Sequence, residues 1–257
     1  MLTMLNYVAL KTIVRKEVIR FMRIWPQTLL PPIITQGLYF AIFGKFIGSQ
    51  IGQVHGVSYM AFIIPGLVMM AVINNSYANV VSSFFGSKFQ RNVEEVMVSP
   101  TSNWVIMAGY SIGGILRGLL VGLLVFIIST LFEHPVIFNF GIILLFILLT
   151  SLVCSLGGLL NGILATKFDD VSIFPTFILT PMTYLGGVFY SIHSLPEAWQ
   201  KISMYNPILY MVNGFRYGFY GFTDVSLALS IFLLCLLNVV LAVLTLVMLK
   251  KGIGLKS

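Results

Sequence analysis

The stretch Leu195-Pro196-Glu197-Ala198-Trp199 interrupts a long succession of apolar segments near the end of the chain. Asn206-Pro207 and Arg216 follow it closely. Proline ends helices and charged side chains are costly in lipid, whereas the flanking segments are long enough to cross a bilayer. The sequence therefore predicts an all-α membrane protein in which a bundle of transmembrane helices carries one polar, proline-broken hairpin.

The composition excludes an ordinary soluble domain. Of the 257 residues, 58% are hydrophobic and 9% are charged, whereas about a quarter of the residues of a soluble domain are charged. A crossing takes about 20 apolar residues, so the length leaves room for short loops but not for a separate soluble domain. Six transmembrane spans are predicted, at 26–47, 58–84, 103–131, 137–165, 171–191 and 226–249.

Residues 3–23 have the pattern of a helix that lies in the membrane interface. The apolar arc contains Leu10, Ile13, Val14, Val18 and Phe21, and the basic arc contains Arg15, Lys16, Arg20 and Arg23. Glu17 and Ile19 are exceptions, because each falls on the arc of the other kind.

The basic residues predict the orientation of the chain. The net charge of +7 comes from few residues beside membrane segments, so anionic lipid is the expected counter-charge and nucleic acid is not an expected partner. Lys11, Arg15, Lys16, Arg20, Arg23, Lys88, Arg91, Lys167, Lys250, Lys251 and Lys256 fall on one side, and Lys45, Lys201 and Arg216 on the other. Lysine and arginine favour cytoplasmic loops, so both termini are predicted to be cytoplasmic and the number of crossings even.

The interruption itself predicts a re-entrant hairpin over residues 194–222. Ser194 and Glu197 have the spacing of a capping box that begins a short helix, and Asn206-Pro207 is expected to end that helix. A seventh crossing over 207–222 would place Arg216 in lipid and the C-terminal lysines outside, so this segment is predicted to dip into the outer leaflet only.

The loop between the second and third spans predicts a short amphipathic helix over residues 88–100. Its apolar face contains Phe89, Val93, Val96, Met97 and Pro100, and its charged residues are Lys88, Arg91, Glu94 and Glu95. An apolar face of this kind suits docking into a partner's groove, and the alternative is a solvated turn.

Arg117 is an ionisable residue near the middle of the third span and is therefore a functional candidate. Asn74, Asn75, Ser76 and Asn79 lie at comparable depth on the second span, so a polar contact between the two spans is expected. The alternative is that Arg117 is only a structural hydrogen-bonding centre. Glycines at four-residue spacing are expected to be packing contacts between helices, namely Gly109 with Gly113, Gly114 with Gly118 and Gly122, and Gly158 with Gly162.

No catalytic or cofactor motif is recognisable. The sequence contains no Gly-x-x-x-x-Gly-Lys-Ser/Thr phosphate loop, so this chain is not expected to bind ATP in that manner. His55, His134 and His193 are isolated and lack metal-ligand spacing, and Asp169-Asp170 are interpreted as solvated charges. We expect no enzyme activity, no metal site and no cofactor bound by this chain.

These features together resemble the permease subunits of ABC-2 type transporters, in particular those of bacterial inner membranes. The resemblance covers essentially the whole chain and is strongest from Pro181 to Gly221. The residues that carry it are Gly186-Gly187-Val188-Phe189, Leu195-Pro196, Trp199, Asn206-Pro207, Tyr210 and Arg216. The family's usual Ser-Gly before the outer hairpin is Gly186-Gly187 here, which keeps the helix break but removes a hydroxyl.

The resemblance implies a homodimer on which two copies of a separate ABC ATPase act, and ATP and Mg²⁺ would be bound by that partner. It assigns ATPase coupling to Arg91, Val93, Glu94, Glu95, Val96, Met97, Ser99 and Pro100. It assigns an outer gate to Gly186, Gly187, Pro196, Trp199, Asn206, Pro207 and Arg216. Asn74, Asn75, Asn79 and Arg117 are the candidates for the translocation path or an intramembrane polar contact. The expected cargo is a hydrophobic or lipid-linked molecule moved outward.

The alternative function is a secondary transporter driven by an ion gradient. Such carriers usually bind the driving ion at acidic residues or broken helices near the middle of the membrane. Glu133, Asp169, Glu197 and Asp224 all fall in loops or at span ends, so the sequence favours the ATP-driven transporter.

Overall fold

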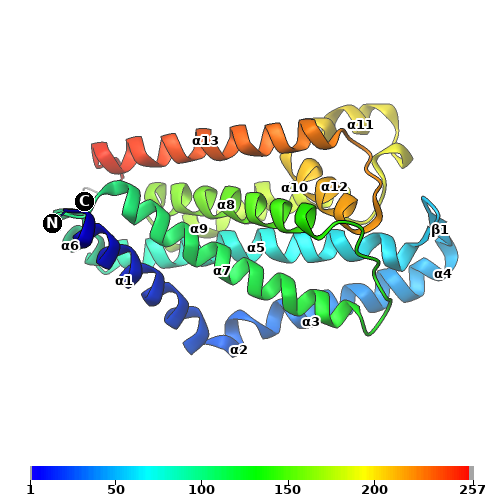
Figure 1. The fold of residues 1–257 in the computed structure, drawn as a ribbon, viewed down its shortest axis with the longest axis horizontal. Coiled ribbons are helices and arrows are strands. Elements are labelled where there is room, and N and C mark those ends of the chain that lie inside the picture. The colour runs from blue at the N-terminus through cyan, green and yellow to red at the C-terminus, as the bar shows by residue number, and fades with distance from the viewer. Residues whose placement is uncertain (1, 255–257) are drawn as a thin grey trace.

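The computed structural model of the chain describes residues 2–254 and is almost entirely helical (Figure 1). The side chains of Leu2, Thr3 and Met97, and the whole of Lys256, lie outside the described part. In chain order the elements are α1 (Leu2–Arg23), α2 (Trp25–Thr28), α3 (Leu30–Tyr39), η1 (Phe40–Ile47), α4 (Gly48–Ile51), β1 (Gln53–Val54), β2 (Val57–Ser58), α5 (Tyr59–Phe89), α6 (Asn92–Val98), α7 (Asn103–Ser129), α8 (Phe140–Leu164), α9 (Phe168–Phe174), η2 (Pro175–Leu179), α10 (Thr180–Tyr184), η3 (Ile192–Ser194), α11 (Glu197–Met204), α12 (Pro207–Tyr220) and α13 (Leu227–Lys251). The strands β1 and β2 form a small antiparallel hairpin.

Five helical segments within residues 2–254 are long and apolar enough to cross a membrane. They are Trp25–Ile51, Tyr59–Phe89, Asn103–Ser129, Phe140–Leu164 and Leu227–Lys251. Each has a counterpart among the predicted spans. The predicted span at 171–191 corresponds to a shorter helical run, α9–η2–α10, which ends at Tyr184 before Gly187 adopts a left-handed φ of 73°.

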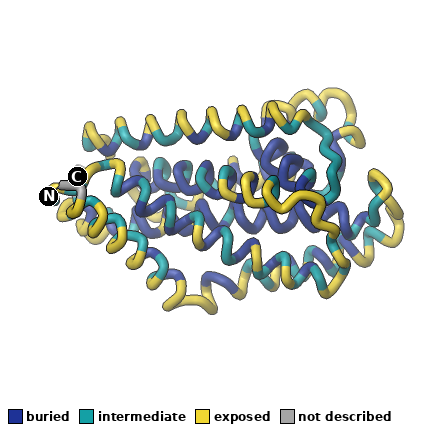
Figure 2. Tube along the Cα trace, in the orientation of Figure 1, coloured by how far each residue is buried: buried dark blue, intermediate teal, exposed yellow. Residues whose placement is uncertain are grey.

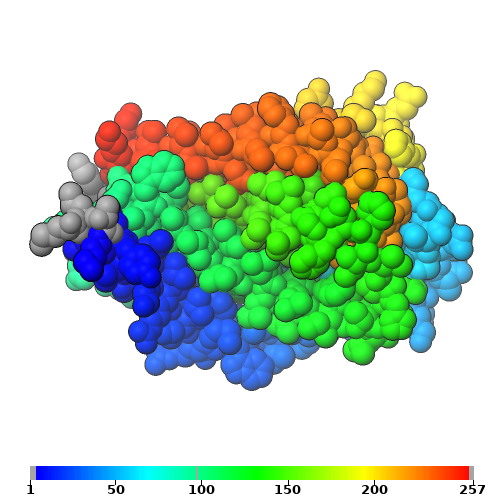
Figure 3. Space-filling view, in the orientation of Figure 1, coloured from blue at the N-terminus to red at the C-terminus, as the bar shows by residue number. Residues whose placement is uncertain are grey.

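Helix α5 forms the centre of the bundle, as the dark blue tube in Figure 2 shows. In its most apolar stretch 94% of the residues are buried, against 17% in α13 and in Trp25–Ile51. It packs mainly on α7 and α8, and α13 packs along α8 at the upper edge of the view in Figure 3. Among the five long segments, the first span and α13 are therefore the peripheral ones.

The glycine rows are packing contacts, as predicted. A Cβ atom on Gly118 would lie 2.0 Å from Oγ of Ser76 on α5. A Cβ atom on Gly158 of α8 would lie 2.6 Å from the carbonyl oxygen of Tyr77 on α5. The absence of side chains at these positions lets α7 and α8 approach α5 closely.

The first span and the helical run after Phe168 are irregular. The first span breaks at Leu29 and then changes from α-helix to the π-helix η1, and the later run contains the π-helix η2. Long π-helical segments are rare and often mark functional sites. Both segments lie outside the tightly packed centre around α5.

The predicted helix at 88–100 is shorter in the structure because α5 continues to Phe89. Arg91 then takes a left-handed conformation with φ of 61°, which separates α5 from α6. Lys88 therefore belongs to α5, where its Nζ donates to the carbonyl oxygen of Ile163 at 2.8 Å.

The predicted capping box at Ser194 is wrong. Ser194 lies in the short 3₁₀ helix η3, where its hydroxyl donates to the carbonyl oxygen of Ser191, and Pro196 is the residue before α11. The residue that precedes a proline is kept extended, so Leu195 ends η3 and α11 can begin only after it. Asn206 not only follows α11 but also caps α12, since its Oδ1 accepts from the amide of Ile208 at 3.0 Å.

The interpretation of Asp170 as a solvated charge is also incomplete. Its carboxylate accepts hydrogen bonds from the amide and hydroxyl of Thr166 and from the amide of Lys167, which together stabilise the start of α9. These donors favour the ionised form and hold the pKa of Asp170 below its usual range.

This cap should respond to pH. A carboxyl whose folded pKa is lowered stabilises the folded state above its unfolded pKa of about 3.9 and loses that contribution as the pH falls through the folded pKa. We expect D170N to loosen the start of α9 at neutral pH, measured as faster amide hydrogen exchange over residues 166–172. Exchange in D169N, which changes the neighbouring exposed carboxylate, should stay as in the unmodified chain.

Candidate functional site

Helix α6 lies at the end of the molecule where both described chain ends also lie (Figure 1). Arg91, Glu94 and Glu95 are exposed there, and we call these three residues together with Pro100 the outer face of α6. The hydroxyl of Ser99 donates to the carbonyl oxygen of Val96 at 2.6 Å and ends the helix. The side chain of Met97 lies outside the described part of the structure.

Part of the predicted apolar face packs inward, whereas Phe89 and Pro100 are exposed. Val93 is 6% exposed and belongs to one hydrophobic cluster with Phe84 and Ile106, and Val96 packs against the same cluster. The reason is that α5 extends past the predicted boundary, so that α6 folds back onto the bundle. The surface that the α6 segment offers to a partner therefore combines two neighbouring acids with the exposed apolar side chains of Phe89 and Val98.

Neighbouring elements hold the α6 segment. The amide of Ser102 donates to Oδ1 of Asn6 on α1 at 3.3 Å. The rings of Phe89 and Phe168 lie 4.8 Å apart, which links the end of α5 to the start of α9. The segment thus contacts both elements that flank α5 at this end.

Arg117 forms the expected polar contact with the second span. Its Nη2 donates to Oδ1 of Asn75 at 3.1 Å and to the carbonyl oxygen of Thr28 at 3.4 Å. The arginine therefore joins α7 to α5 and to the break between α2 and α3. Asn79 does not take part in this contact.

Asn79 belongs to a second polar contact, between α1 and α5, which the sequence reasoning missed. Glu17 is fully buried, and its Oε2 accepts from Nη2 of Arg20 at 3.1 Å. The same Nη2 donates to Oδ1 of Asn79 at 2.8 Å, and the hydroxyl of Ser83 donates to Oε1 of Glu17. The available signal was Glu17 itself, an acid on the apolar arc of an otherwise amphipathic helix.

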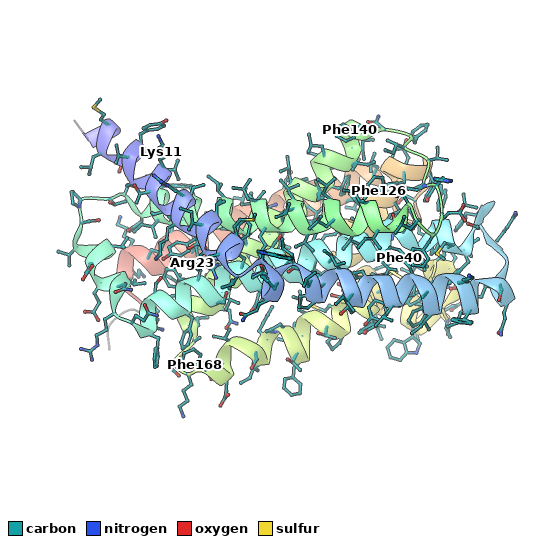
Figure 4. All side chains as sticks on the ribbon, turned by 90° about the horizontal axis from the view of Figure 1, so that it is seen from below. Lys11, Arg23, Phe40, Phe126, Phe140 and Phe168 are labelled. Carbon is teal, nitrogen blue, oxygen red and sulfur yellow. The ribbon has the colours of Figure 1, made fainter. Side chains whose placement is uncertain are left out.

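Asn74 lies on a different side of α5. It is half-buried, and Ala78, Ser82 and Gly86 follow it at four-residue spacing. Ala78 and Ser82 are exposed and Gly86 is half-buried. We call these four residues the open strip. On neighbouring sides of the same helix, Asn79 contacts α1 and Tyr77 stacks on Phe174 of α9. Figure 4 shows α1, labelled at Lys11 and Arg23, and the helix that begins at Phe168 on opposite sides of this end of α5.

Arg216 ties the proline-broken hairpin to the bundle. Its side chain is fully buried, its Nη2 donates to the carbonyl oxygen of Gly187 at 2.7 Å, and its guanidinium lies 4.0 Å from the ring centroid of Phe62. A cation over an aromatic face is attracted to the ring, the more so when water is excluded. Arg216 thus links α12 to α5 and to the turn after α10.

Two further predicted hairpin residues act in the same region. Nδ2 of Asn206 donates to the carbonyl oxygen of Met182 at 2.6 Å, and a Cβ atom on Gly186 would lie 2.7 Å from Cγ2 of Ile208. Pro207 opens α12, which follows directly. Pro196 and Trp199 are exposed on the far side of the hairpin, so the structure does not bring them together with Arg216.

The sequence predicts an isolated His55, but in the structure this side chain has polar neighbours. Its Nε2 lies 3.3 Å from Oγ of Ser191 and 3.4 Å from Oδ1 of Asp224, and Asp224 also accepts from the Ser191 hydroxyl. Serine and aspartate both face the same ring nitrogen, whereas a nucleophilic triad places them on opposite nitrogens. The three residues therefore connect three loops at the end of the molecule opposite α6 and do not form a catalytic triad.

The described residues contain no group of three or more His, Cys, Asp or Glu side chains arranged to hold a metal ion. The family model of the ABC-2 type transporter matches residues 8–220, which include the first span, α6 and nearly all of the hairpin. The chain belongs to the ABC-2 type transporter family. As an ABC-2 permease it is a multi-pass membrane subunit of an ABC transporter, and in such transporters a separate subunit hydrolyses ATP.

This ABC-2 permease is similar to known relatives over most of its length. It is 54% identical over 253 residues to the inner membrane transport permease YadH of Escherichia coli K12, covering 98% of this chain and 99% of the relative. It is 24% identical over 204 residues to nodulation protein J of Rhizobium leguminosarum bv. viciae, covering 79% of each chain.

Proposed function

We propose that this chain is the membrane subunit of an ATP-driven exporter in the bacterial inner membrane and that it works as a homodimer. Two copies of a separate ABC ATPase would bind ATP and Mg²⁺ and dock on the two permease chains. The cargo would be a hydrophobic or lipid-linked molecule moved outward. Family membership disfavours the ion-gradient alternative.

The observation that carries this proposal is the outer face of α6. Glu94 and Glu95 are exposed at the end of α5, the central helix of the bundle, and contacts with α1 and α9 hold the segment in place. A partner that moves α6 therefore acts directly on the centre of the membrane domain. Arg91, Val93, Val96, Met97, Ser99 and Pro100 would belong to the same coupling segment, with Val93 and Val96 anchoring it to the bundle.

We propose six crossings, with both termini in the cytoplasm. The sixth crossing would be the predicted span at 171–191, which combines the helical run up to Tyr184 with the turn residues that follow it. The described chain ends and α6 lie at one end of the molecule, which fits an even number of crossings (Figure 1). Anionic lipid would face the exposed basic residues of α1.

We propose that the translocation path follows the open strip of Asn74, Ala78, Ser82 and Gly86. Small and polar residues there are exposed on a helix that is otherwise largely buried. A polar strip that faces lipid is costly, so a second copy of the chain would enclose it. Arg117, Asn75 and Asn79 are engaged by protein partners, which supports a structural role for them rather than contact with cargo.

We propose that the hairpin closes the outer end of this path. Gly186, Gly187, Asn206, Pro207 and Arg216 would fix the base of the hairpin, while Pro196 and Trp199 lie on its exposed arm. Opening would then require movement around the turn at Gly187.

The coupling assignment is tested by charge reversal. The double variant E94K/E95K should lower permease-stimulated ATP hydrolysis at least about tenfold, since like charges placed across an interface cost several kcal/mol and about 1.4 kcal/mol changes an equilibrium tenfold. The measurement is ATP turnover of the purified complex in lipid nanodiscs, with and without the permease.

The matched control is E197K, which reverses an exposed acid on α11 at the opposite end of the molecule. It should leave stimulated turnover unchanged. Full stimulation of the ATPase by E94K/E95K would show that the outer face of α6 is not the coupling surface.

A further inference from the structure

Helix α5 carries a buried row of polar residues at four-residue spacing, Asn75, Asn79, Ser83 and Ser87, which we call the polar ladder. Residues four apart lie on one side of a helix. Each member bonds to a side chain from a neighbouring helix: Asn75 to Arg117, Asn79 to Arg20, Ser83 to Glu17, and Ser87 to Lys16 and Tyr110. Three successive rungs therefore receive side chains from α1.

Glu17 is the carboxylate that completes these contacts. It accepts from Arg20 on its own helix, from the Ser83 hydroxyl and, at 3.5 Å, from Nδ2 of Asn79. Arg20 in turn donates to both the side-chain and the main-chain oxygen of Asn79, at 2.8 and 2.9 Å. The ion pair within α1 is thus bonded directly to α5.

The surroundings of Glu17 leave little freedom to rearrange. A Cβ atom on Gly113 of α7 would lie 2.6 Å from Cβ of Glu17, so the backbone of α7 passes directly against this side chain. An apolar residue of similar size would usually fill such a site at a lower desolvation cost. A buried charge with directed partners instead fixes the position of one helix along another, because sliding by one turn would separate every bonded pair.

The ladder ends where the coupling segment begins. Ser87 is its last rung, α5 ends at Phe89, and α6 starts at Asn92. The amide of Ser102, just beyond α6, is bonded to Asn6 of α1. The segment that contains α6 is therefore attached to α1 on both sides.

We infer that Glu17 is a positioning residue for energy coupling: it fastens α1 to the polar ladder, so that α1 moves together with α6. This inference rests on the proposed function, in which the ATPase acts on α6. Without the carboxylate, Arg20 keeps only its bonds to Asn79, and the attachment between α1 and α5 weakens. Motion of α6 then fails to carry α1.

The test uses spin labels on the complex with its ATPase in nanodiscs, with Cys154 and Cys235 replaced by alanine. Labels at Asn92 and Lys251 report the motion of α6, labels at Thr12 and Lys251 report the motion of α1, and all three positions are exposed. Labelled chain is diluted with unlabelled chain, and distances are measured by double electron–electron resonance before and after addition of ATP. Both distances should shift in the reference protein, whereas E17Q should retain the shift of α6 and lose that of α1.

The double variant E17Q/N79D should restore the shift of α1, because it places the carboxylate on α5 at the position that Arg20 already contacts at 2.8 Å. R15Q removes an exposed charge from the same helix and should leave both shifts intact. S83A removes a single hydrogen-bond donor to Glu17 and should reduce the shift of α1. This variant replaces E17Q in the test if E17Q does not fold. A normal shift of α1 in E17Q, or in S83A if that variant stands in for it, would overturn the inference.

A reference protein in which neither distance responds to ATP would refute the proposed function, and with it the transmission role. The distance between labels at Thr12 and Asn92, measured without ATP, would still test whether Glu17 fastens α1. We expect the distribution of this distance to be narrow in the reference protein and in E17Q/N79D and broader in E17Q. An unchanged width in E17Q would show that Glu17 does not fasten α1.

Discussion

Replacement of Gly158 by leucine is expected to lower the free energy of unfolding by about 3 kcal/mol or more, at the upper end for overpacked cores. The first side-chain carbon would lie 2.6 Å from the carbonyl oxygen of Tyr77. That oxygen belongs to the backbone of α5, which is packed on several sides and cannot move aside as a side-chain end could. Helix α8 must therefore separate from α5.

The measurement is thermal unfolding of the purified chain in detergent, in which this loss corresponds to a fall in Tm of roughly 6 °C or more. Gly157 provides the matched control, because nothing lies within 4 Å of a Cβ atom built there. G157L should change the free energy of unfolding by at most about 0.5 kcal/mol. Equal losses in G157L and G158L would mean that close approach to α5 at Gly158 does not determine the loss.

Replacement of Arg216 by methionine is expected to cost about 2–4 kcal/mol, from the loss of a charged hydrogen bond and a desolvated cation–π contact. Methionine keeps most of the length of the side chain but leaves the carbonyl oxygen of Gly187 without its donor. The turn after α10 is then no longer held to α12. We expect thermal destabilisation together with faster hydrogen exchange over residues 185–224.

Two further variants separate the contributions at this site. F62L removes the aromatic face but not the bond to Gly187, and its cost combines the cation–π part, about 0.5–2 kcal/mol, with the lost packing of a fully buried ring. R216K keeps the charge but replaces the planar guanidinium by a single ammonium. The stability of R216K should lie between that of R216M and that of the unmodified chain. Unchanged exchange over 185–224 in R216M would show that Arg216 does not hold the hairpin.

Much of the membrane architecture was predictable because a long apolar segment in lipid has few alternatives to forming a helix. Five predicted spans have helical counterparts, and their glycine rows pack as expected. The boundaries near residues 88–100 were wrong because the left-handed turn at Arg91 depends on how α6 folds back, and local periodicity does not record that contact. The same contact buries Val93, so one part of the predicted apolar stripe belongs to the core, while Phe89 stays exposed.

The polar contacts were only partly predictable. Comparable depth on neighbouring spans paired Arg117 with Asn75, and the structure contains that bond. Glu17 was recognised only as a break in an amphipathic pattern, because its partners on α5 lie more than sixty residues away in the sequence. The contact between His55 and Asp224 joins two loops that have no shared periodicity, so no local signal points to it.

The placement of both described chain ends beside α6 has a practical consequence for protein engineering. A fused domain at either end would emerge on the side of α6, and a flexible tether spans at most about 3.3–3.6 Å per residue. A short tether on either end is thus sufficient to place a fused reporter domain beside the outer face of α6, whereas the hairpin lies at the opposite end of the molecule, beyond the reach of such a tether.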